Sequence, residues 1–310
     1  MTTGAAPVAD DASRRRRVGI AMVVVAACMW GTWPLLLRYA DSKGAVPASV
    51  KTAIMMTTIA IVSFAFVPFD RVKRKAPPRE WLGVVWLGVG DALNAMCLFY
   101  AYKIASVAVA ALTHDTGPLL VAVFAPMLLR ERVRRATFAA IAMSLVGLTF
   151  MLRPWEVAAS KDELTGAGFG LLSAVFYASN VIMNKRLTGS FSGSELMAWH
   201  GLFALPVLLL VSGLHAWSLL KPLPVVVLAI AAIGPGALGG LLFAWSVRRI
   251  EASLAATIAL LEPIVAILLS VALLGEKLTL LGGVGVGLDL ASAWLVVRPQ
   301  RVGVARAGAP

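Results

Sequence analysis

Four carboxylate side chains stand inside long stretches of apolar residues: Asp91, Asp115, Glu262 and Asp289. An ionised side chain in the middle of a lipid bilayer costs at least about 2.5–3.5 kcal/mol on insertion scales, so such a group usually faces a cavity or a partner. A carboxyl group held in this way can bind a cation or exchange a proton. His114 and His200 are the titratable bases in similar surroundings.

Glu262 has the most suggestive surroundings of the four, because it directly precedes Pro263. A proline inside a helix removes one backbone donor, which leaves the carbonyl of Ala259 without its helical partner. The freed carbonyl and the carboxyl group lie in one short stretch, which suits a cation or a proton. The alternative is that Glu262 makes a polar packing contact between helices.

A second such arrangement precedes Pro118, which frees the carbonyl of His114. Adjacent residues of a helix point about 100° apart, so His114 and Asp115 cannot both face one cavity. Asp115 shares the face of Pro118, and we therefore expect it to be the residue that faces a cavity. A buried contact between this histidine and aspartate is an equally good interpretation.

Polar and aromatic side chains recur at helical spacing in other apolar stretches, as in Asp91 with Asn94 and Tyr177 with Asn180. Aromatic faces beside carboxylates can hold an amine by cation–π attraction, worth about 2 kcal/mol when desolvated, although plain packing is the alternative. Asp289 lies in a Gly-rich stretch that favours close helix packing. The candidate binding residues are Trp30, Trp33, Asp91, Asn94, His114, Asp115, Tyr177, Asn180, Trp245 and Glu262, and the candidate helix breaks with a gating role are Pro34, Pro118 and Pro263.

The stretches that carry these residues have the composition of membrane-spanning helices. Hydrophobic residues make up 59% of the chain and charged residues 14%, against about a quarter charged in soluble domains. About 20 apolar residues cross the hydrocarbon as a helix, since the backbone must satisfy its own hydrogen bonds there. We predict an all-α integral membrane protein with ten spans, at 18–38, 52–69, 81–102, 104–129, 136–153, 164–184, 196–216, 223–247, 252–275 and 278–297.

The basic residues indicate an orientation. Of the 28 Lys and Arg residues, 20 fall on one side of the predicted spans, together with the tails 1–17 and 299–310. The positive-inside rule then places both termini in the cytoplasm, and the protein in the inner membrane. Because these residues lie in short loops, the net charge of +12 does not indicate nucleic-acid binding. The apolar run after Arg17 continues past Cys28 to Leu37, so we expect a span rather than a cleaved lipoprotein signal.

The two halves of the chain share a pattern. In each half, a proline in the middle of a span is followed thirteen residues later by a glutamate, at a shift of 145 residues. Five spans in each half, at 18–153 and 164–298, force the second half to enter the membrane upside down. Such inverted repeats are a transporter architecture. The matched pairs are Pro118 with Pro263, Glu131 with Glu276, Tyr100 with Trp245 and, at a shift of 147, Trp30 with Tyr177.

These residues resemble the EamA-type branch of the drug/metabolite transporter superfamily. The resemblance rests on Trp30-Gly31, the segment from Pro118 to Glu131, and Leu261-Glu262-Pro263 followed by Gly275-Glu276. It implies a ten-helix transporter of metabolites, frequently an exporter, with a central cavity lined by both halves. Four-helix multidrug exporters of this superfamily have an essential carboxylate in their first helix. Residues 18–37 are uncharged here, so their mechanism does not transfer directly.

Together these features predict a secondary transporter that exports a small amphipathic metabolite, such as an amino acid, an amine or a drug-like compound. Carboxylates with few buried bases, and no Lys or Arg in the interior of the spans, favour a cationic or zwitterionic substrate over a phosphorylated one. The alternatives are an uptake permease for a sugar or other nutrient and a non-transporting membrane subunit. The partners expected are the substrate and the lipid bilayer, with coupling to protons or passive flux both open. The sequence has no nucleotide-binding loop and no catalytic cluster, so we expect no enzyme, cofactor, metal or nucleic-acid partner.

Overall fold

A computed structural model describes residues 6–44, 46–70, 72, 76–218, 220–275 and 277–298. Within these residues, ten helical segments are long and apolar enough to cross a membrane, and no strand occurs. The predicted all-α fold with ten spans is therefore confirmed. Glu276 and the tail 299–310 lie outside the described residues.

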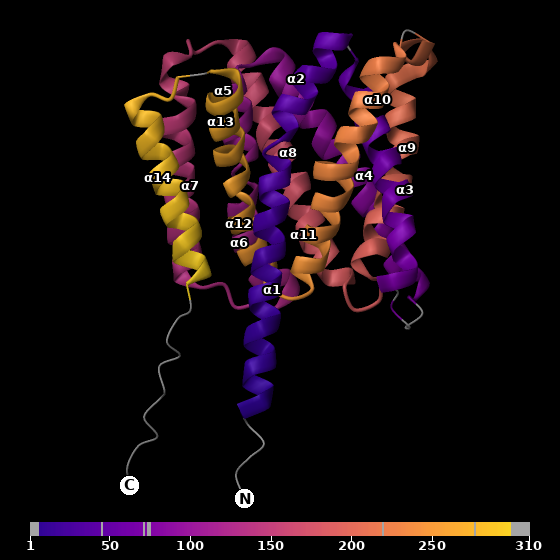
Figure 1. The fold of residues 1–310 in the computed structure, drawn as a ribbon, viewed down its shortest axis with the longest axis vertical. Coiled ribbons are helices and arrows are strands. Elements are labelled where there is room, and N and C mark those ends of the chain that lie inside the picture. The colour runs from indigo at the N-terminus through magenta and orange to yellow at the C-terminus, as the bar shows by residue number, and fades with distance from the viewer. Residues whose placement is uncertain are drawn as a thin grey trace, which may run out of the picture.

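Six spans are single helices in the chain (Figure 1). The first of them ends at Asp70. A short 3₁₀ turn, Pro154–Glu156, joins the two halves. These spans are α3 (Ala48–Asp70), α4 (Pro78–Ile104), α7 (Arg135–Leu152), α8 (Lys161–Leu187), α9 (Gly193–Ser218, with a kink at Gly213 where its span ends) and α14 (Leu280–Val297).

The other four spans are interrupted in the middle of the membrane, and each interruption has a proline next to it. Three of these prolines stand in the first turn of the second segment, where a missing backbone N–H costs nothing. In the eighth span Pro235 lies inside a π-helical stretch, Ala232–Leu238. The interrupted spans are α1 (Ala6–Trp30) with α2 (Trp33–Lys43), α5 (Val107–His114) with α6 (Gly117–Leu129), α10 (Pro222–Ala231) with α11 (Gly239–Val247), and α12 (Ala252–Ala259) with α13 (Leu261–Leu274).

Helix α1 is longer than its apolar part. We predicted a tail over residues 1–17, but the helix begins at Ala6 and carries the arginines beyond the bundle (Figure 1). Alanine and arginine are strong helix formers, so the helix continues after the apolar run has ended. The start of α1 and the end of α14 lie at the same end of the bundle, which we call the terminal end.

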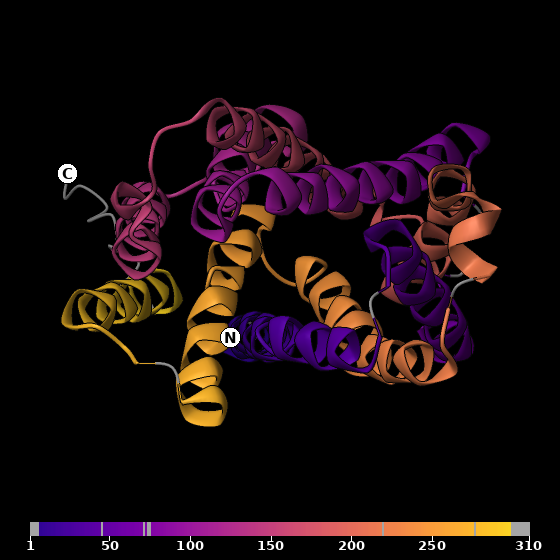
Figure 2. The same ribbon diagram turned by 90° about the horizontal axis from the view of Figure 1, so that it is seen from above.

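The main helix contacts join one half of the chain to the other. Helix α4 packs on α8, α3 on α9, α7 on α14, α1 on α11 and α6 on α12. Figure 2 shows α7 beside α14 at one side of the bundle. Each span of the first half has a counterpart five spans later in the second half. If every span is replaced by its counterpart, the contact of α4 with α8 becomes the contact of α11 with α1. The other three contacts each join a span to its own counterpart, so the exchange leaves them unchanged. An approximate two-fold axis in the membrane would produce this pattern.

Helices α7 and α14 approach closely at two glycines. A Cβ on Gly285 would collide with the carbonyl oxygen of Gly147 and lie 2.7 Å from Cγ of Met151. Beside them the hydroxyl of Ser144 donates to Asp289, which is 1% exposed. Small residues and a buried hydrogen bond are the usual means of helix association in membranes. Asp289 therefore holds a helix pair at the edge of the bundle.

We expect Gly285→Ala to lower the free energy of unfolding by about 1–3 kcal/mol, because the added methyl group overpacks the contact between α7 and α14. Gly287→Ala is the matched control on the same helix, since a Cβ there meets nothing within 4 Å. Thermal unfolding of both variants in detergent checks this. Equal stability of the two variants would contradict the close approach at Gly285.

Candidate functional site

A cavity of about 320 Å³ lies in the middle of the bundle. It contains no Lys or Arg side chain among the described residues that line it, but it does contain Asp91 and Glu262. Helices of both halves form its wall: α1 to α4 in the first half, and α8, α9, the π-helical stretch, α11 and α13 in the second. The lining consists of Trp30, Trp33, Thr52, Met55, Met56, Ile59, Leu87, Asp91, Asn94, Ala95, Leu98, Phe99, Tyr177, Asn180, Val181, Asn184, Leu196, Met197, His200, Gly236, Gly240, Phe243 and Glu262.

The cavity extends along much of the bundle. Helices α3 and α9 pack together in opposite directions, since Ser194 at the start of α9 contacts Asp70 at the end of α3. Thr52 near the start of α3 and Leu196 near the start of α9 therefore lie toward opposite ends, and both line the cavity. The cavity thus extends along the bundle between the levels of Thr52 and Leu196.

Aromatic rings form part of the wall near Glu262. Trp30 lies with its ring centroid 5.2 Å from that of Phe243, and Trp33 and Tyr177 also line the cavity. Indole and phenol faces carry negative charge density, which attracts cations. The predicted aromatic residues Trp30, Trp33 and Tyr177 thus come together with a carboxyl group on one cavity.

Asp91, on α4, has hydrogen-bond partners from two other helices. His200 Nε2 on α9 lies 2.9 Å from its Oδ2, and Asn180 Nδ2 on α8 lies 3.4 Å from its Oδ1. Asn94 on the next turn of α4 contacts the same oxygen at 3.5 Å. A carboxyl group in this setting has replaced its water with protein donors. Asp91 therefore ties α4 to α8 and α9 as well as lining the cavity.

The polar chain continues behind the cavity wall to His114. Ser173 Oγ donates to Asn94 Oδ1 at 2.6 Å, and His114 Nδ1 lies 2.8 Å from the same hydroxyl. A hydroxyl group has one hydrogen to donate, so with that hydrogen on Asn94 the Ser173 oxygen is free to accept from Nδ1 of His114. The ring of His114 packs edge-on against Tyr177, with centroids 5.7 Å apart. His114 thus supports the wall and does not line the cavity.

Glu262 differs from Asp91 in having no hydrogen-bond partner among the residues that the structure describes. It lies in the first turn of α13, directly after the break at Leu260. Gly31, at the break between α1 and α2, faces this turn so closely that a Cβ would lie 2.8 Å from the carbonyl oxygen of Glu262. Two helix breaks therefore meet at the one cavity carboxyl group that the protein leaves unpaired.

Besides His114, two other candidate binding residues lie outside the described lining of the cavity. Asp115 follows the end of α5 and is close enough to interact electrostatically with Glu262 and Asp289, which places it toward α13 and α14. Asp115 is not among the described residues that line the cavity. Trp245 lies one to two turns beyond Gly240, and its ring reaches past the cavity to Asp70.

Several residues that line the cavity were not predicted from the sequence. Thr52, Met55 and Met56 on α3 belong to an apolar run with no feature that marks one face. Gly236 and Gly240 line the cavity beside a π-helical turn that no local pattern revealed. Pro235 alone could have indicated the break. His200 was recognised as titratable, but its partner Asp91 is 109 residues away in the sequence.

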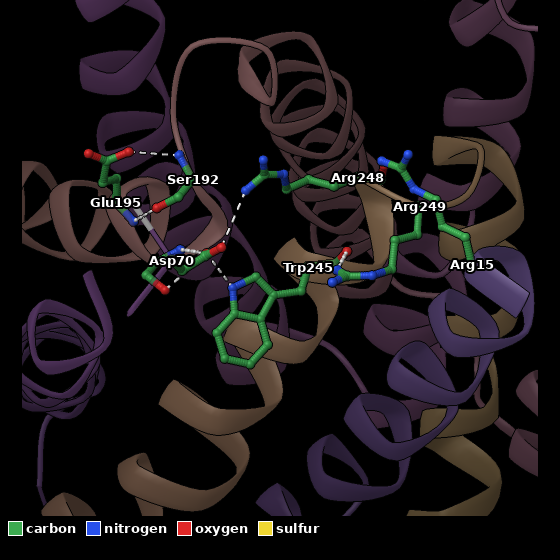
Figure 3. A network of polar contacts seen from close by, with 8 residues as sticks. Arg15, Asp70, Ser192, Glu195, Trp245, Arg248 and Arg249 are labelled. Carbon is green, nitrogen blue, oxygen red and sulfur yellow. Dashed lines mark hydrogen bonds and ion pairs between the residues drawn. The ribbon is translucent and has the colours of Figure 1, made fainter. Parts of the chain in front are cut away.

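Polar contacts gather around Asp70 at the terminal end, on the far side of Leu196 (Figure 3). Asp70 Oδ2 accepts from Trp245 Nε1 at 2.6 Å and from the Ser194 hydroxyl at 3.2 Å, and Arg248 Nη1 lies 3.5 Å from Oδ1. A capping box at the start of α9, in which Ser192 and Glu195 bond each other's backbone N–H, positions Ser194. The Asp70 cluster thus joins α3 to α9 and α11.

We expect Asp70→Asn to lower the free energy of unfolding by about 1.5–3 kcal/mol, because hydrogen bonds to a charged acceptor are lost in a partly buried place. Asp41→Asn is the control, since the exposed Asp41–Lys51 pair, with its atoms 2.6 Å apart, is worth about 0–1 kcal/mol. Thermal unfolding of both variants measures the difference. A loss no larger for Asp70 than for Asp41 would show that the cluster does not hold this end together.

Ten apolar spans around a central polar cavity define the class: a multi-pass membrane protein with a binding cavity within the membrane. The sequence profile of the EamA-like transporter family matches residues 17–153 and 164–298. The chain therefore belongs to the EamA-like transporter family and is a transporter rather than an enzyme.

Known proteins similar to this chain agree with the family. An uncharacterized transporter of Clostridium kluyveri is 24% identical over 84% of this chain and 86% of its own, and one of Archaeoglobus fulgidus is 28% identical over 92% and 98%. A pseudopaline exporter of Pseudomonas aeruginosa is 28% identical over 45% of this chain and 51% of its own. A solved crystal structure matches 89% of this chain and 95% of that chain with a TM-score of 0.76 at 21% identity, which shows the fold alone.

Proposed function

We propose that the protein is a secondary transporter that exports a small cationic or zwitterionic amphipathic metabolite, such as an amino acid, an amine or a drug-like compound. The observation that carries the proposal is Glu262, an unpaired carboxyl group on a cavity with aromatic walls and no Lys or Arg side chain in its described lining. An ammonium group could pair with this carboxylate and lie against the faces of Trp30 and Trp33.

A zwitterionic substrate would also contact the side of the cavity around Asp91. A substrate carboxylate needs hydrogen-bond donors, and Asn94, Asn180 and His200 supply amide and imidazole groups there. A phosphorylated substrate is disfavoured, because two carboxylates without a lysine or arginine would repel it. Glu262 would thus select the amine and the Asp91 side would tolerate a polar group.

Export is favoured over uptake by one relative, whose name describes it as a pseudopaline exporter and which resembles about half of this chain. An uptake permease for a sugar or other nutrient is the alternative direction of flux. A non-transporting subunit is disfavoured, since it would have no need for carboxylates along a cavity in the membrane.

We further propose that the two five-span halves are inverted repeats that alternate access to the cavity, with both termini in the cytoplasm of a cell whose inner membrane holds the protein. The exchange symmetry of the helix contacts supports this arrangement. The breaks beside Pro34, Pro118 and Pro263 lie in the middle of spans, where segments could tilt separately. The excess of basic residues at the terminal end supports the orientation.

Ligand binding tests the substrate class. A panel of amines, amino acids, sugars and phosphorylated metabolites is added to the purified protein, and a ligand that binds the folded state raises the unfolding temperature. We expect stabilisation by amines or zwitterions, lost or weakened at least about tenfold in Glu262→Gln. Asp289→Asn, which removes a buried carboxyl group outside the cavity, is the control. Stabilisation by sugars alone would favour the nutrient permease.

Coupling is tested with the ligand found in this way. We expect Glu262→Gln to fold and insert but to lose acceleration of transport by a pH gradient in reconstituted vesicles. Glutamine keeps the shape and hydrogen-bonding capacity of the side chain but cannot exchange a proton. Asp289→Asn should keep the acceleration. Full gradient-driven transport by Glu262→Gln would make passive flux the better mechanism.

A further inference from the structure

A second hollow lies at the terminal end of the bundle, separate from the central cavity. Its volume is about 410 Å³, and four arginines surround it (Figure 3 shows three of them). Two come from the start of α1 and two follow the end of α11, so segments more than 230 residues apart in the sequence form one site. The lining consists of Asp11, Arg14, Arg15, Val18, Asp70, Arg248 and Arg249.

Positive charge exceeds negative charge in this hollow. Four guanidinium groups face two carboxylates, and one of these, Asp70, already accepts from Trp245 and Ser194 as well as pairing with Arg248. Asp70 thus has little capacity left to neutralise the other arginines. The hollow therefore holds more positive charge than its two carboxylates can neutralise.

Two of the four arginines donate to backbone carbonyl groups. Arg249 Nη1 donates to the carbonyl oxygen of Trp245 at 2.6 Å, and Arg15 Nη2 lies 3.4 Å from the carbonyl oxygen of Arg248. Each guanidinium carries five N–H donors, so these contacts leave others for a ligand. Burial, aided by the neighbouring Arg248 and Arg15, lowers the pKa of Arg249 from its ordinary value. An anion would relieve this repulsion.

The position of the hollow fits a phosphate group. Its arginines stand just before Val18, where the apolar part of α1 begins, and just after Val247, where the eighth span ends. Phosphates of lipid headgroups and of soluble metabolites are both available at that level. Guanidinium groups bind phosphate in bidentate fashion, and its several oxygens can be shared among arginines, whereas a carboxylate offers only two.

We propose that this hollow is a phosphate-binding site, which takes the phosphate group either of a soluble anion or of an anionic lipid. The site is distinct from the transport cavity, whose lining has no arginine.

The test measures the unfolding temperature of the full-length protein in neutral detergent at constant ionic strength. Inorganic phosphate is titrated against acetate, and short-chain phosphatidylglycerol against short-chain phosphatidylcholine. We expect phosphate or phosphatidylglycerol to stabilise the wild type beyond its matched control. Stabilisation in the first arm identifies a soluble anion, and stabilisation in the second arm alone identifies a lipid headgroup.

Variants localise the effect. Arg14→Gln/Arg15→Gln should weaken the apparent affinity at least about tenfold, since each basic residue near a membrane surface is worth about 1 kcal/mol. Arg130→Gln/Arg135→Gln removes the same charge from exposed loop and helix-start positions outside the hollow and should bind as the wild type does. Asp11→Asn removes a competing carboxylate and should tighten binding.

The inference is overturned if neither probe stabilises the wild type beyond its control, or if both double variants weaken binding equally, because the effect would then come from the basic face as a whole. Should Arg14→Gln/Arg15→Gln fail to fold, Asp11→Asn decides the matter. Tighter binding of the stabilising probe by that variant supports the site, and unchanged binding overturns it.

Discussion

The absence of water in the hydrocarbon core is the constraint on which this structure depends. A polar group in the membrane must find a partner in the protein or line a space that admits one. Asp289 meets this requirement through Ser144, and Asp91 through His200 and Asn180. Glu262 does not, and it faces the cavity. The three carboxyl groups thus differ in role because they differ in partners, although the sequence presents all of them in apolar surroundings.

The same constraint explains where the helices break. A backbone carbonyl freed by a proline is tolerated in the membrane only beside other protein groups or a cavity. The breaks at Thr32 and Leu260 meet at Glu262, where Gly31 brings α1 against α13. The π-helical turn around Pro235 adds the glycines Gly236 and Gly240 to the wall. Irregular backbone therefore collects around the cavity, whereas the edge pair α7 and α14 is built from unbroken helices.

The charged residues at the terminal end form two neighbouring groups. The Asp70 cluster is compact, with one carboxylate shared among Trp245, Ser194 and Arg248. Beside it, Arg249 and the arginines of α1 surround a hollow in which donors outnumber acceptors. The first group joins α3 to α9 and α11, and the second is the site that we propose for a phosphate group. Both depend on α11 ending where α1 leaves the membrane.

The sequence by itself determined the ten spans, because each apolar run must form a helix whatever surrounds it. It also marked Trp30, Asp91, Tyr177 and Glu262, since polar and aromatic residues are conspicuous in such runs. Only the tertiary structure decided which side chains share a space. Asp115 and Trp245 lie outside the cavity, while Met56 and His200 lie on it. Partners such as His200 and Asp91 are far apart in the sequence, and their meeting depends on how helices of the two halves pack and rotate, which the pattern of any single helix does not specify.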